Sequence, residues 1–132
     1  MTTRDPITCH VLDTTTGLPA RSLRVRLEGG TPPLKTFESS TDDDGRIRTW
    51  LPYSSDTSAG EVPVYTLHDV LGQLDDGAPS SWTLRFDTAG YFGERQETFF
   101  PEVVVAFRVH AGQQYHVPLL LGPFSYTTYR GS

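Results

Sequence analysis

Two of the four histidines, His10 and His116, lie in segments whose alternating pattern is typical of β-strands. Each points away from the apolar residues that fill the expected core, so each imidazole is available for chemistry. Neutral histidine is suited to proton transfer near pH 7. We expect His68 and His110 to be solvated, because the first lies in an irregular segment and the second beside a glycine turn. A strand arginine, Arg46, supplies a fixed cation to such a pair.

Other chemistries are less well supported by the residues present. A zinc site needs more ligands than two histidines, and Asp13 begins a turn, where aspartate is common anyway. Cys9 cannot act with His10, because adjacent residues in a strand face opposite sides. Ser132 lacks the Gly-x-Ser-x-Gly context of a serine nucleophile. We therefore expect no metal and no cofactor.

An Asp-rich stretch, residues 42–45, has two readings. Carboxylates can bind calcium, but the spacing lacks the ligand pattern of an EF-hand loop. Asp-Gly is a common hairpin turn. We interpret the stretch as a turn that leads into a strand beginning at Arg46.

The segment from Tyr115 to Leu121 organises the chain, because it is apolar on both faces. Val117, Leu119 and Leu121 point one way, and Pro118 and Leu120 point the other. Antiparallel sheets usually expose one face to water, so we expect the second face to meet another subunit. A Gly-Pro turn then leads into a second strand, which we expect to run to the last residue.

The remaining pattern predicts an all-β fold, a β-sandwich of about eight strands with one or two short helices. Alternation marks strands at 23–28 and 81–87, and a weaker strand, expected at an edge, at 35–41. Further expected strands cover 7–13, 46–50 and 103–109, and residues 89–98 have room for a helical turn or two. Residues 1–132 form one expected domain, with a surface insertion around 52–79 that carries a short amphipathic helix near 66–73.

Composition narrows the partners and the compartment. The net charge of −5 argues against nucleic-acid binding, and the chain holds no apolar run long enough to span a membrane. The single cysteine cannot form an internal disulfide, which favours a reducing compartment. The first residues lack an apolar signal-peptide core, so we expect a cytoplasmic protein, with peroxisomal import by another route as the alternative.

Several motifs resemble those of the 5-hydroxyisourate hydrolase family, whose fold is transthyretin-like. The motifs are Cys9–Ala20, Asp44–Ile47, Phe99–Val103, Tyr115–Leu121 and the terminal Tyr129-Arg130-Gly131-Ser132. The terminal tetrapeptide is the most discriminating of these, because transthyretin has the fold without it. The resemblance covers nearly the whole chain apart from the insertion.

This resemblance implies a function and a site. It implies metal-free hydrolysis of 5-hydroxyisourate to 2-oxo-4-hydroxy-4-carboxy-5-ureidoimidazoline in urate breakdown, carried out by a homotetramer, a dimer of dimers with active sites in a central channel. Carried over by residue, the active-site positions are His10, Arg46, His116 and Ser132, with Tyr129, Arg130 and Gly131 shaping the pocket. The alternative is a non-enzymatic, transthyretin-like carrier of small ligands.

Overall fold

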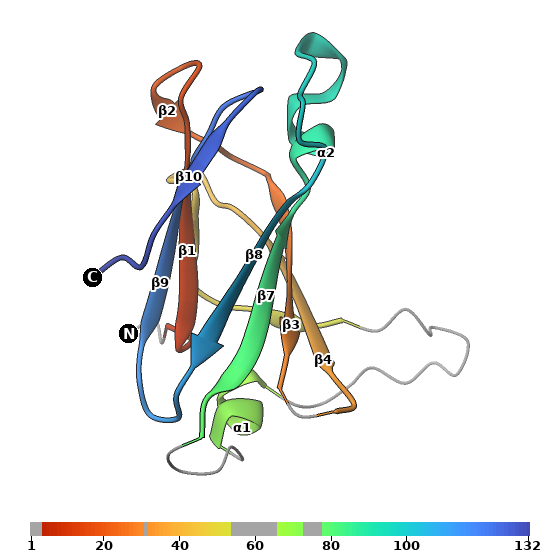
Figure 1. Ribbon diagram of the computed structural model, residues 1–132. Helices are drawn as coiled ribbons and strands as arrows, with labels where there is room; N and C mark the ends of the chain where they lie inside the picture. Colours follow the sequence, from red (N-terminus) through yellow and green to blue (C-terminus); the bar gives the residue numbers. More distant parts are fainter. Residues whose placement is uncertain (1–3, 31, 54–65, 73–77) are drawn as a thin grey trace.

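Two β-sheets face each other and enclose the core, with short helical segments at the two ends of the sandwich (Figure 1). The computed structural model describes residues 4–30, 32–53, 66–72 and 78–132. The strands in this part of the chain are β1 (Ile7–Asp13), β2 (Leu18–Pro19), β3 (Arg24–Gly29), β4 (Lys35–Ser40), β5 (Arg46–Ile47), β6 (Leu51–Pro52), β7 (Ser80–Phe86), β8 (Val103–Val109), β9 (Tyr115–Leu121) and β10 (Tyr126–Thr128). The helical segments are α1 (Leu67–Gly72), α2 (Thr88–Phe92) and the 3-10 turn η1 (Gly93–Arg95). The predicted all-β sandwich with short helices is confirmed.

Sheet A carries both candidate histidines. Its strand order is β10-β9-β1-β2, and β5 also pairs with β1. Strands β1 and β9 run parallel, whereas the other pairs in the sheet are antiparallel. Sheet B has the order β6-β4-β3-β7-β8 and is antiparallel throughout. The parallel pair joins the two ends of the chain, so residues more than 100 positions apart become direct neighbours.

Alternating apolar residues from both sheets form the core, as the sequence pattern predicts. In β1, Ile7, Cys9 and Val11 are fully buried, and in β9 Leu119 and Leu121 are almost fully buried. Sheet B contributes its own alternating set to the same core: Val25, Leu27, Phe37, Trp82, Leu84, Phe86, Val103 and Val109. Because one face of each strand is buried in this way, the opposite face of β1 carries His10 outward.

The strand expected over residues 46–50 is shorter than predicted, and the next strand after it lies in the other sheet. β5 ends at Ile47 and pairs with β1 in sheet A, whereas β6 begins at Leu51 and pairs with β4 in sheet B. Trp50 lies where the chain passes from sheet A to sheet B. Its backbone N–H donates to the Asp5 carboxylate at 2.7 Å, and its indole N–H donates to the Ile7 carbonyl at 2.8 Å. These bonds take the place of a continuous ladder.

The expected terminal strand is also shorter than predicted. β10 ends at Thr128, and Gly131 then forms an isolated antiparallel bridge with His116 in the same register. Pro118 lies opposite the gap and has no backbone N–H to give to a ladder. Its carbonyl accepts the Thr128 hydroxyl at 2.8 Å. The proline therefore interrupts the pairing, and Gly131 resumes it beside His116.

One smaller expectation is also corrected. β4 is not an edge strand, because the two-residue β6 covers its free side. On the outer face of β9, Pro118 is buried within the chain, close to Gly131, while Leu120 remains 36% exposed. That another subunit covers this face stays a prediction.

The insertion around 52–79 lies largely outside the described residues, at 54–65 and 73–77. The helix predicted near 66–73 is confirmed as α1, with Leu67 and Leu71 buried. Within the described ranges, no helix has the length and apolar character needed to cross a membrane.

Candidate active site

The pairing of three strands places His10, Arg46 and His116 on the outer face of sheet A. His10 lies directly opposite Arg46 in the antiparallel pairing of β1 with β5. His116 lies opposite Thr8, which is two residues before His10 on the same face of β1. Residues opposite one another in paired strands share a face, so these side chains converge. Three segments that are distant in sequence thus form one cluster.

The two imidazoles lie close together on this face. Their ring centroids are 6.4 Å apart, and their planes differ by 29°. Both rings are half-buried. Desolvation is the first cause that lowers the pKa of each histidine, and the Arg46 guanidinium is the second. Both imidazoles are therefore neutral near pH 7 and able to accept a proton.

A tight turn between β4 and β5 delivers Arg46 to this face. One oxygen of the Asp42 carboxylate accepts the backbone N–H groups of Asp44 and Arg46, each at 2.9 Å, and the other accepts the Arg48 guanidinium at 2.8 Å. Gly45 has a φ of +74°, and a Cβ there would lie 2.5 Å from the Val11 carbonyl oxygen. The predicted turn is confirmed. Both oxygens of the Asp42 carboxylate accept hydrogen bonds, one from the backbone of the turn and the other from Arg48.

The same turn also orients His10. Its imidazole hydrogen-bonds to the backbone carbonyl of Asp44, a contact that raises the pKa of His10 against the larger effects of burial and Arg46. A carbonyl only accepts, so in this contact His10 donates a ring N–H. Asp42 and Arg48, which fix the turn, were not singled out in the sequence as functional residues. The Asx-type pattern, with Asp42 four residues before Arg46, was the available signal.

One residue of the terminal segment contacts the cluster, and the others lie on the surrounding surface. Gly131 donates its backbone N–H to the His116 carbonyl at 2.8 Å. Arg130 instead places its guanidinium over the Tyr115 ring, 4.6 Å from the centroid, and Tyr129 is 57% exposed. Ser132 is exposed. In the single chain, the structure thus brings His10, Arg46, His116 and Gly131 together, while Tyr129, Arg130 and Ser132 lie outside that group of contacts.

Tyr129 and Arg130 line a hollow together with His116. It has a volume of about 410 Å³ and lies between β8 and the β9–β10 pair. Phe107, Val105 and Val117 contribute its apolar wall. His116 therefore borders this hollow as well as the cluster on the outer face of sheet A.

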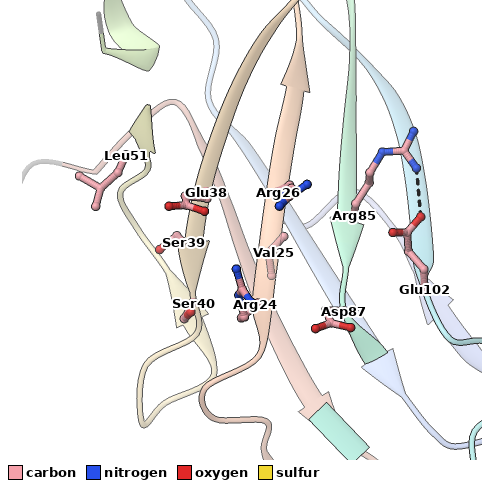
Figure 2. Close-up of a pocket in the computed structure, with 10 residues that line it drawn as sticks. All are labelled: Arg24, Val25, Arg26, Glu38, Ser39, Ser40, Leu51, Arg85, Asp87 and Glu102. Atoms are coloured by element: carbon pink, nitrogen blue, oxygen red, sulfur yellow. Dashed lines mark hydrogen bonds and ion pairs between the residues drawn. The ribbon is translucent and has the colours of Figure 1, made fainter. Parts of the chain in front are cut away.

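A larger hollow, about 500 Å³, lies on the outer face of sheet B and is shown in Figure 2. Two of its arginines are engaged with neighbouring side chains. Arg85 contacts Glu28 at 3.2 Å and Glu102 at 3.0 Å, and Arg26 lies over the Tyr53 ring. Its described lining includes no histidine or cysteine. The outer face of sheet A is therefore the better candidate for acid–base chemistry.

The alternative nucleophile and ligands occupy structural positions. Cys9 faces the core, and burial raises the pKa of its thiol to about 12, so it is not a nucleophile beside His10. The Asp13 carboxylate accepts the Tyr91 hydroxyl at 2.7 Å and the Thr15 N–H at 2.9 Å, which ties the end of β1 to α2. Across the described ranges, no three His, Cys, Asp or Glu side chains are grouped so as to hold a metal ion.

Comparison with known proteins identifies the family of the chain. Residues 7–131 match the model of the HIUase/Transthyretin family. The chain belongs to this family. It is 40% identical to the 5-hydroxyisourate hydrolase of Mus musculus, with 99% of this chain and 98% of the mouse protein covered.

Two solved structures from the family share the fold. The 5-hydroxyisourate hydrolase of Klebsiella pneumoniae superposes with a TM-score of 0.65 at 25% identity, covering 96% of this chain and 98% of the other. Sea bream transthyretin, solved in complex with thyroxine, gives a TM-score of 0.68 at 23% identity, covering 96% and 94% of the two chains. The family therefore includes proteins named as enzymes and a protein solved in complex with thyroxine, and the residues of the site must distinguish the two.

Proposed function

We propose that this protein is a hydrolase that opens the six-membered ring of 5-hydroxyisourate, a step in urate breakdown. The observation that carries the proposal is the cluster itself: two neutral imidazoles and a guanidinium converge on the outer face of sheet A. A carrier has no chemical need for such a set. The curated relative from Mus musculus, which matches over nearly its full length, carries the name of this activity.

The reaction needs a base, an acid and a charge stabiliser. One imidazole removes a proton from water, whose oxygen adds to a ring carbonyl carbon of the substrate. Arg46 stabilises the negative charge that develops on the carbonyl oxygen, because the Asp42 turn fixes the backbone from which its planar donors extend. The C–N bond then breaks, and the leaving nitrogen takes a proton from an imidazolium. The product is 2-oxo-4-hydroxy-4-carboxy-5-ureidoimidazoline.

The two histidines share the proton transfers, and no metal or cofactor enters the scheme. We assign the base and acid roles to His10 and His116 jointly. Ser132 completes the site by orienting the substrate or the water, with Tyr129, Arg130 and Gly131 shaping its wall. The close approach of Gly131 to His116 supports this part of the proposal, because it places the terminal segment at the edge of the cluster.

We also propose that four chains assemble around the site, as a dimer of dimers. The last strands on one side of each sheet, β8 and β10, have no further strand beside them among the described residues. Leu18, the first residue of β2, and Phe124, in the β9–β10 turn, are more than 60% exposed. Leu120 lies on the same face as the site. Further copies that cover these groups enclose the outer face of sheet A as a channel.

The decisive assay follows the absorbance of freshly made 5-hydroxyisourate with and without the protein. We expect catalytic loss of substrate that is unchanged after dialysis against a strong chelator. A carrier would bind the compound without turnover, and that result would overturn the proposed function. Loss of activity on chelation, with recovery on adding zinc, would contradict the metal-free scheme alone.

A further inference from the structure

Thr8 contacts one catalytic candidate directly and has no role in the scheme above. It lies in β1 opposite His116 in the parallel pairing with β9, and its side-chain oxygen is 2.8 Å from Nδ1 of that histidine. Thr8 is only 8% exposed, so water competes little for this contact. We propose that Thr8 is a positioning residue that holds His116 as the Nδ1–H tautomer and leaves Nε2 as the proton acceptor.

The direction of the hydrogen bond follows from a third group. The Thr8 hydroxyl is also 3.4 Å from the backbone carbonyl of Tyr115, and a carbonyl can only accept. The single hydroxyl proton therefore points to this carbonyl, and the hydroxyl oxygen accepts the Nδ1–H of His116. The reverse arrangement would direct lone pairs of Thr8 and the carbonyl at each other. Because buried polar groups are hydrogen-bonded, the first arrangement is favoured.

The opposite edge of the imidazole is held by the terminal segment. A Cβ built on Gly131 would lie 2.8 Å from Cδ2 of His116 and 2.9 Å from Cγ of Pro118. The Gly131 backbone therefore lies against the ring edge that Thr8 does not contact. A ring flip would exchange Nδ1 with Cδ2 and would lose the bond to Thr8. The ring is fixed at both edges, so Nε2 keeps one position.

The described groups that act on the charge of His116 include no carboxylate that could accept its Nδ1–H. Within the described residues, the groups that act on its charge are Arg46 from β5, His10 from β1 and Arg4 from the segment before β1. Each of these, with burial as the largest cause, lowers the pKa of His116. No carboxylate is among them, so the Thr8 oxygen is the acceptor that the geometry offers to Nδ1–H.

The tautomer can be read directly in the intact wild-type protein. Nuclear magnetic resonance of ¹⁵N-labelled histidine, above the pKa of His116, should show a protonated Nδ1 and an unprotonated Nε2. The opposite tautomer would overturn the proposal. This measurement needs no substrate, so it stands even if the proposed function fails.

The catalytic consequence rests on the proposed function and needs a matched pair of variants. Thr8→Val keeps the shape of the side chain and removes its oxygen, whereas Thr8→Ser keeps the hydroxyl. We expect Thr8→Val to lower kcat about 3- to 10-fold with little change in KM, the size expected for one lost hydrogen bond. Thr8→Ser should stay near the wild-type rate.

The acidic limb of the pH–rate profile shows whether Thr8 accepts a hydrogen bond from Nδ1 of His116 or donates one to it. Because the Thr8 oxygen stabilises the protonated ring, Thr8→Val should lower the pKa of His116 further and move the limb to lower pH. A limb that moves to higher pH would show that Thr8 donates to Nδ1, and a wild-type rate would show that it positions nothing. Circular dichroism checks that each variant is folded. If Thr8→Val does not fold, the NMR experiment on the wild-type protein still determines the tautomer.

Discussion

At the scale of single residues, the site depends on two imidazoles that stay neutral beside a permanent cation. Burial is the largest cause that lowers the pKa of both His10 and His116, and the charge of Arg46 adds to it. Each pKa therefore lies below the ordinary value of 6.5. This arrangement keeps a base available across the neutral range.

A pH prediction follows from these directions. The base works only when neutral, so kcat/KM should be constant above about pH 6.5 and should fall as the pH drops through a pKa below that value. Steady-state rates between about pH 5 and 8, taken while the protein remains folded, provide the measurement. If kcat/KM instead falls with a pKa at or above the ordinary histidine value, burial and Arg46 do not determine the pKa of these histidines.

Arg46 is predicted to act through its geometry as well as its charge. Arg46→Lys keeps the charge but loses the planar set of donors, so we expect kcat to fall by about 10-fold or more, toward the cost of one lost oxyanion donor. Arg24→Lys is the matched control, because Arg24 is an exposed strand arginine on the outer face of sheet B (Figure 2). Equal rates in the two variants would remove Arg46 from the mechanism.

At the scale of elements, the turn at residues 42–45 positions Arg46 and contacts His10. Sequence reasoning predicted this turn from its Asp-Gly end, and it predicted the bounds of β1, β8 and β9. It missed the parallel pairing of β1 with β9, because alternation shows which residues are buried but not which strands are neighbours. The proximity of Thr8 to His116 depends on that pairing, so the sequence pattern alone could not reveal it.

The strand ends were the least predictable part, because they depend on contacts distant in sequence. The 46–50 segment reads as one strand, but Asp5 captures the Trp50 N–H and the chain crosses between sheets. The terminal strand reads as continuous, but Pro118 on the neighbouring strand breaks the ladder. Neither effect can be seen within the segment itself.

Two glycines with similar backbone angles give a test of the turn. Gly45 has a φ of +74° and is crowded by Val11, whereas Gly17 has a φ of +72° and open space where a Cβ would stand, with nothing within 4 Å. Gly17→Ala should lower the free energy of unfolding by about 1 kcal/mol, because alanine is strained in the left-handed backbone conformation. Gly45→Ala should cost more and should also lower activity, because the backbone beside Arg46 must shift. Urea unfolding at one protein concentration measures both, and equal losses would contradict the crowding at Gly45.

At the scale of the whole molecule, we predict a homotetramer. Four chains of 14.7 kDa make about 59 kDa, in the closed symmetry usual for homo-oligomers. Sedimentation at micromolar concentration should show this species, and Leu120→Glu should give smaller ones because it places charge on the outer face of sheet A. A wild-type protein that sediments only at 14.7 kDa would contradict the assembly and the enclosed channel.

The central claim is that His10 and His116 act as one unit in hydrolysis, and the kcat of their single and double variants tests it most directly. We expect His10→Ala and His116→Ala each to lower kcat on 5-hydroxyisourate by about 10²–10⁴-fold. Since residues that act as a unit are non-additive, the double variant should be scarcely slower than the slower single variant. Sedimentation of each variant must match the wild type. Wild-type turnover in either single variant would show that the chemistry takes place elsewhere, and losses that multiply in the double variant would show that the two imidazoles act independently.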